Sequence, residues 1–172
     1  MDKQAEAALK RAIGMLEAIL VRQTAIHKDM LAVADAKQDA IIKGDLEKLE
    51  KAVVDERVLV AKIEEEEKKR LAVMPLVKSG METPEDLEKL ADIIALMPEP
   101  ERARMTAVRE ELKSVLEECQ IKTRHNAELL KASLEHVEAF LRTLAEETAR
   151  DKTYDRGGKK LGGGPGLIDR SI

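Results

Sequence analysis

The sequence contains almost no aromatic residues: it has no Trp, one Phe and one Tyr. Compact cores usually take much of their buried area from large aromatic side chains. A fold that manages without them is expected to be thin, one or two helix diameters across, with a core of aliphatic side chains. The chain is instead rich in Ala, Glu, Lys, Leu and Arg, which are strong helix formers. The composition therefore predicts long helices and excludes a sheet.

Cysteine is also scarce, since Cys119 is the only one, and no disulfide can form within the chain. A single cysteine favours a reducing compartment. The charged N-terminal residues lack the apolar stretch of a secretory signal, and no apolar run approaches the roughly 20 residues that span a bilayer. The sequence therefore predicts a cytoplasmic protein of ordinary domain size, with no membrane insertion.

Residue patterns that carry chemistry are missing as well. The three histidines, His27, His125 and His136, do not have the spacing of metal ligands. Cys119 falls on an apolar helix seam, where a small buried thiol is the expected role. The glycine-rich C-terminal stretch lacks the preceding strand and the following Ser or Thr of a phosphate-binding loop. We therefore expect no enzyme activity, no metal site and no cofactor.

The net charge of −4 conceals a difference between the two ends of the chain. Residues 150–172 carry six basic and three acidic side chains, so that this stretch is at +3 and the rest of the chain is at −7. A phosphate backbone would repel so acidic a body. We therefore do not expect nucleic acid as a partner.

Apolar residues recur at three- and four-residue spacing along most of the chain, as on the first helix at Leu9, Ile13, Leu16 and Leu20. The pattern predicts an all-α fold with four helices, at about residues 2–43, 46–74, 84–96 and 100–150.

The ends of these helices are predicted from caps and prolines. Gly44 suits a left-handed C-cap and Asp45 a following N-cap, and we favour a break between two helices over a kink in one rod. Pro75 is expected to end the second helix at Met74, because proline disfavours the helical conformation of the residue before it. Residues 83–84, Thr-Pro, have the chemistry of a helix start.

The last helix is the longest, since about 50 residues at 1.5 Å each give ~75 Å. A helix of this length is not stable alone. The first two helices are expected to pack antiparallel against it, as a slender hairpin or three-helix coiled bundle over residues 1–150. Residues 151–172 contain six of the nine glycines, and we expect them to form a flexible, disordered tail.

Residues 64–70 form the charged run Glu-Glu-Glu-Glu-Lys-Lys-Arg. Two interpretations are a docking patch and a solvated helix face on which opposite charges lie three and four residues apart. We favour the solvated face, because such pairs routinely stabilise exposed helices.

Four stretches of the sequence, in this order, resemble the FlgN-type flagellar export chaperones. They are residues 16–20 (LEAIL), 41–49 (IIKGDLEKL), 125–134 (HNAELLKASL), and 154–158 (YDRGG) with the close 167–172 (LIDRSI). The resemblance covers roughly residues 9–172, and the Tyr-Asp-x-x-Gly tail with its Leu-Ile-Asp-Arg close is the most distinctive part. One departure is the near absence of aromatic residues on the last helix, where Phe140 is the only large anchor.

The resemblance implies a cytoplasmic chaperone that holds the terminal helices of flagellar hook-associated proteins and delivers them to the flagellar type III export gate, without a cofactor. In such chaperones the C-terminal portion contacts the client. A tyrosine near the C-terminus is implicated in docking the cytoplasmic domain of the gate, which here implies Tyr154. The implied client surface comprises Leu130, Leu134, Val137, Phe140, Leu141 and Leu144.

The alternative is a structural coiled-coil scaffold that mainly self-associates. The apolar rows of the last helix are wider than one seam requires, which suits the grip of a client helix but also suits packing between two neighbouring helices. The tail discriminates between the two, because a scaffold has no need of Tyr154 or of residues 167–172 after a glycine spacer. An exposed apolar face on the last helix would favour the chaperone, and a fully covered one the scaffold.

Overall fold

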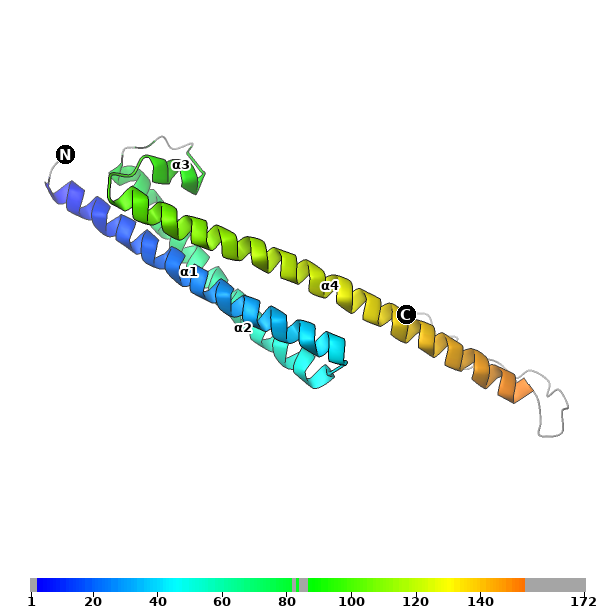
Figure 1. Cartoon of the computed structure of the whole chain (residues 1–172). Coiled ribbons are helices and arrows are strands. Elements are labelled where there is room, and N and C mark those ends of the chain that lie inside the picture. The colour runs from blue at the N-terminus through cyan, green and yellow to red at the C-terminus, as the bar shows by residue number, and fades with distance from the viewer. Residues whose placement is uncertain (1–2, 82, 84–86, 154–172) are drawn as a thin grey trace. The chain divides into compact units, whose positions relative to one another are not determined.

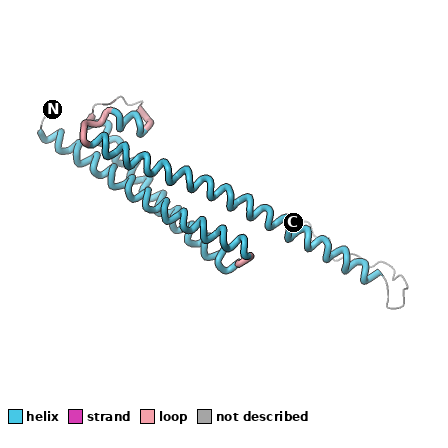
Figure 2. Tube along the Cα trace, in the orientation of Figure 1, coloured by secondary structure: helices cyan, strands magenta, loops and turns pink. Residues whose placement is uncertain are grey.

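The computed structural model describes residues 3–81, 83 and 87–153, and the regular structure among them is entirely helical (Figure 2). Its four helices are α1 (Lys3–Lys43), α2 (Leu46–Gly80), α3 (Leu90–Ala95) and α4 (Glu101–Thr153) (Figure 1). The predicted all-α class is confirmed. The fold divides into two units, residues 1–129 and 130–172, with the boundary inside α4.

In the first unit, α1 and α2 form an antiparallel hairpin that turns at Gly44 and Asp45 (Figure 1). Gly44 has a φ of 63°, in the left-handed region that glycine adopts at little cost. Asp45 is the N-cap of α2, and its carboxylate accepts a hydrogen bond from the Lys48 backbone N–H at 3.1 Å. The predicted break between two helices is therefore confirmed, with the expected caps.

Two glycines of this hairpin are expected to respond to alanine in opposite directions. Gly14 lies within α1, where an added Cβ would meet no atom within 4 Å, so Gly14→Ala is expected to raise the free energy of unfolding by about 0.5–1 kcal/mol. Gly44→Ala is expected to lower it by about 1 kcal/mol, because of the positive φ. Urea unfolding followed by circular dichroism measures both, and shifts of the same sign would contradict the expectation.

The core of the first unit lies where α1 begins and α2 ends, and α3 and the start of α4 pack onto it (Figure 1). It is aliphatic, as the scarcity of aromatic residues predicts. Burying each such side chain contributes roughly 1.5–3 kcal/mol of transfer free energy. Its most deeply buried side chains are Ile13, Leu16, Leu20, Val77, Ile93, Met97 and Met105.

The first half of α4 lies along α1. The Arg104 Nε donates to the Glu17 carboxylate at 3.4 Å, and the Asn126 Nδ2 donates to the Ala34 carbonyl at 2.8 Å. Residue numbers rise together on the two helices, so α4 runs parallel to α1 and antiparallel to α2. The expectation that both earlier helices run antiparallel to the last one is therefore right in direction for α2 and wrong for α1. An up–down–up connection gives the first and third long helices the same direction.

The predicted end of α2 at Met74 is wrong, because α2 continues through Pro75 to Gly80. Proline inside a helix costs about 3 kcal/mol. Here the Pro75 ring is exposed, while Val73, Met74 and Val77 on the same turns are buried. Keeping the helix intact buries these three side chains in the core, and that gain outweighs the cost of the proline.

The third helix is shorter than predicted, since α3 begins at Leu90 and not at residue 84. Residues 84–86 lie outside the described residues, and the three residues before Leu90 are not helical. Thr83, expected at the start of this helix, instead closes α2: its N–H and its hydroxyl both donate to the Lys78 carbonyl, each at 3.2 Å. A carbonyl in the last turn of a helix lacks the usual intrahelical donor, and the Lys78 carbonyl accepts instead from Thr83 and from the Met81 N–H at 3.2 Å.

Candidate functional site

The described part of the second unit is the second half of α4, and it carries large apolar side chains that are exposed. Residues 134–149 are all exposed. The exposed fraction of the predicted client residues runs from 41% at Leu144 to 63% at Phe140. We call these six residues the α4 stripe: Leu130, Leu134, Val137, Phe140, Leu141 and Leu144.

Helical spacing places the α4 stripe on one face. From Leu130 to Leu144 its members follow at intervals of four, three, four and three residues, and Phe140 lies three residues after Val137. The stripe spans 15 residues, and the 14 steps from Leu130 to Leu144 correspond to about 21 Å of helix. It therefore offers a continuous apolar surface four turns in length.

Apolar residues at the same helical spacing in the first half of α4 are buried. Met105, Leu112 and Val115 have exposed fractions of 0%, 9% and 8%, and they belong to the contact of α4 with the hairpin. Phe140, on the continued heptad seam, is 63% exposed. One helix thus uses the first part of its apolar pattern for folding and presents the second part to solvent. Tyr154, the predicted gate-docking residue, lies outside the described residues.

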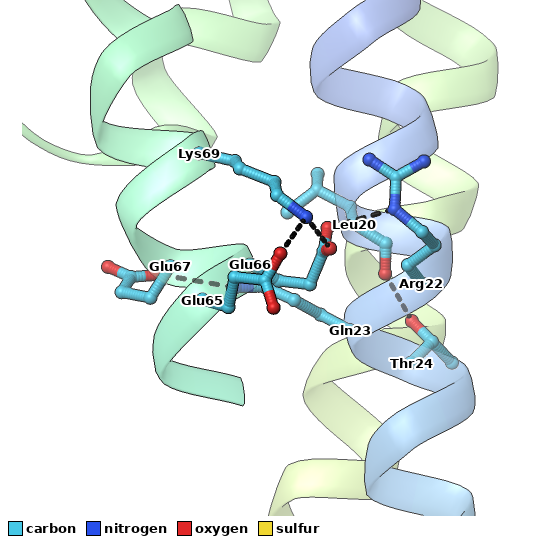
Figure 3. Close-up of polar contacts among 8 residues, drawn as sticks. All are labelled: Leu20, Arg22, Gln23, Thr24, Glu65, Glu66, Glu67 and Lys69. Carbon is cyan, nitrogen blue, oxygen red and sulfur yellow. Dashed lines mark hydrogen bonds and ion pairs between the residues drawn. The ribbon is translucent and has the colours of Figure 1, made fainter. Parts of the chain in front are cut away.

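A polar layer that the sequence did not reveal lies between α1 and α2 (Figure 3). Glu66 is buried there, with an exposed fraction of 6%. Its carboxylate accepts from the Arg22 Nε at 2.9 Å and from the Lys69 Nζ at 2.7 Å. Beside it, the Gln23 Nε2 donates to Glu67 at 3.2 Å. The interpretation of residues 64–70 as a purely solvated face is therefore wrong at Glu66, and the one hint in the sequence is Gln23 on the continued seam of α1.

The hydrogen bond from Lys69, with that from Arg22, holds the pKa of the Glu66 carboxyl below its ordinary value of 4.5, against the opposing effect of burial. Because the folded-state pKa is lowered, the ionised carboxylate stabilises the hairpin fully above about pH 4.5. That contribution is lost as the pH falls from there through the lower folded-state pKa. The layer therefore makes the hairpin sensitive to acid.

Glu66→Gln is expected to lower the free energy of unfolding by about 1–2 kcal/mol at pH 7, because a buried charge-assisted hydrogen-bond network is weakened. It should also reduce the loss of stability below about pH 4.5. Urea unfolding over a series of pH values measures both effects. Glu65→Gln is the matched control, since Glu65 pairs with the same lysine at 2.7 Å but is 67% exposed, and it should change stability by less than about 0.5 kcal/mol. Equal effects of the two substitutions would contradict a role for burial.

Cys119 has a structural place in the contact of α4 with α1. It is half-buried, and its Sγ donates to the His27 carbonyl at 3.4 Å. Burial raises the pKa of the Cys119 thiol, which keeps the reactive thiolate scarce. These observations agree with the role expected from its position on the seam.

A cavity of about 420 Å³ lies between the first turns of α1 and the last turns of α2, with Met15, Leu76 and Arg11 among its lining residues. The lining is mostly apolar and presents no pair of side chains suited to acid–base or nucleophilic work. Within the part of the chain that the structure describes, no cluster of three or more His, Cys, Asp or Glu residues could hold a metal ion. Among those same residues, no helix combines the length and apolar character needed to cross a membrane.

Comparison with known proteins adds one finding to this geometry. A family model described as "FlgN protein" matches residues 12–162, a span that includes α2, α3, α4 and most of α1. No curated protein and no solved structure matches the chain. The matched residues include the whole α4 stripe and Tyr154.

Proposed function

Because the chain belongs to the FlgN family of flagellar export chaperones, we propose that it holds the terminal helices of hook-associated proteins in the cytoplasm and delivers them to the export gate. Chaperones of this family bind flagellar proteins, and the family is not one of enzymes. The identity of the client as a hook-associated protein and the delivery to the gate are the parts that we propose beyond family membership. Family membership favours this function over a self-associating scaffold.

The observation that carries the proposal is the exposure of the α4 stripe. A client helix laid along an amphipathic face is recognised by apolar anchors at three- and four-residue spacing, which is the spacing of the stripe. A soluble protein rarely leaves so many large apolar side chains together in water unless the surface serves binding. Six of them, each at least 41% exposed, can cover a client helix of about four turns.

The binding energy in this proposal comes from apolar burial. A hook-associated terminal helix that is free in the cytoplasm exposes its own apolar face, and laying it on the α4 stripe removes both faces from water at once. Burying each Å² of apolar surface contributes about 25 cal/mol. Capture therefore requires no nucleotide and no metal.

The test is direct binding of purified hook-associated proteins from the same cell, measured by isothermal titration calorimetry. We expect a defined complex with one or more of them, and a loss of binding when their terminal helices are deleted. If none of them binds and the chain forms only complexes with itself, the proposal is wrong and the scaffold is the better description.

Tyr154→Ala is expected to weaken binding of the gate's cytoplasmic domain by about tenfold or more, because aromatic anchors often supply 2 kcal/mol or more at an interface. Client binding should not change, since the α4 stripe is intact. Calorimetry with the purified gate domain and with a client measures the two separately. Tyr154→Phe, which retains the ring, should keep most of the gate affinity. Unaltered gate affinity in Tyr154→Ala would remove Tyr154 from the proposal.

A further inference from the structure

We infer that residues 167–172, the Leu-Ile-Asp-Arg-Ser-Ile close of the chain, bind the α4 stripe when no client is present and compete with the client for it. The competition rests on the proposed function. The contact itself does not, because it follows from the exposed stripe and from the sequence that lies beyond α4.

The closing segment of the chain carries apolar side chains that could cover the α4 stripe. Three of the six residues from 167 to 172 are large aliphatic residues, namely Leu167, Ile168 and Ile172. A contiguous exposed apolar patch commonly marks an interaction site, and an apolar segment linked to it on the same chain is present at high effective concentration. A segment on the same chain has the advantage over any free molecule.

The linker is long enough to reach the whole stripe. From the end of α4 at Thr153 back to Leu130 is 23 residues of helix, or about 35 Å. Residues 154–166 can span up to about 45 Å when extended. A short linker rich in glycine gives its end an effective concentration of about 1 mM, so that even a contact with a dissociation constant of about 1 mM is half-populated.

The charges of the two partners are complementary. Residues 130–149 carry four acidic and two basic side chains, a net charge of −2, whereas residues 154–172 carry two acidic and four basic ones, a net charge of +2. Helical spacing places Glu138 on one flank of the stripe and Glu147 on the other. Arg170 lies within the closing segment itself. The segment can thus lay its aliphatic residues on the stripe with its basic residue near a flanking carboxylate.

A single tryptophan tests the contact without a client. The chain has no Trp, so Phe140→Trp in the full chain places a unique fluorophore within the stripe. If the closing segment covers the stripe in about half of the molecules, removing residues 167–172 should raise the acrylamide quenching constant by about twofold and shift the emission to longer wavelength. Replacing Leu167, Ile168 and Ile172 together by serine should do the same at unchanged length and charge.

The controls separate this contact from other occupants. Leu71→Trp, at a site on α2 that is 58% exposed, should give a quenching constant that truncation does not change. Quenching at position 140 that is the same in the full and truncated chains would overturn the inference. Protection that survives truncation and grows with protein concentration would overturn it too, since a second copy would then cover the stripe.

Client affinity completes the test. The chain truncated after residue 166 should bind a hook-associated client about twofold more tightly than the full chain, because half of the stripe is no longer occupied. Tail-dependent protection without any client binding would refute the proposed function and leave the contact standing. Client binding without tail-dependent protection would refute the contact alone.

Discussion

Replacing Leu134 and Leu141 together by serine is expected to weaken the binding of a hook-associated client by about a hundredfold or more. Both side chains lie near the middle of the α4 stripe, with exposed fractions of 58% and 57%. Fully burying a leucine side chain contributes roughly 1.5–3 kcal/mol, and every 1.4 kcal/mol is a factor of ten in the dissociation constant. Because both side chains already face solvent, the free protein should keep its fold.

A matched control exists on α2, where Leu71 and Leu76 have exposed fractions of 58% and 57%. Replacing this pair by serine removes the same atoms from an equally exposed place outside the stripe. Client affinity measured by calorimetry should then change by less than about threefold, and circular dichroism should give the same helix content for both double variants. Equal losses of affinity in the two pairs would mean that the α4 stripe is not the client surface.

The second large effect is expected in the core, where Leu16→Ala should lower the free energy of unfolding by about 2.5–5 kcal/mol. Leu16 is fully buried, with an exposed fraction of 0%, beside Ile13, Leu20 and Met105. Its removal loses the transfer free energy of the side chain and leaves a cavity that a helical core cannot easily close. For a domain whose total stability is about 5–15 kcal/mol, this is a large fraction.

Met15→Ala is the control for the core variant, because Met15 is the preceding residue on α1 but is 48% exposed. It should lower stability by less than about 1 kcal/mol. Urea unfolding of both variants gives the comparison. If Leu16→Ala cost as little as Met15→Ala, the packing of α1 against α2 and α4 in solution would differ from that of the structure.

Local signals alone were enough to predict much of the fold. The Gly44–Asp45 turn was predicted because each residue has a cap role that depends only on its own backbone and side chain. The aliphatic core followed from the lack of aromatic residues. Where a local signal opposed tertiary packing it failed, as at Pro75, because burying Val73, Met74 and Val77 outweighs the helix preference of one residue.

The burial of Glu66 was beyond prediction for a related reason. Nothing in the sequence distinguishes one of the four consecutive glutamates from the others. Only the position of α1 decides which of them faces Arg22. Successive side chains of a helix point in directions about 100° apart. Of two neighbours in one charged run, one can therefore lie in an interface while the other is in water.

The sequence by itself determined that the chain is helical, where its long helices turn, and that its last helix carries an apolar row through to Leu144. It also contained the residues that resemble the FlgN family, whose model matches residues 12–162. Only the tertiary structure decided which part of that row is buried within the fold and which part is exposed. Met105 is 0% exposed and Phe140 63%, although both follow one pattern, because helical periodicity is the same whether a face packs within the chain or remains open to another molecule.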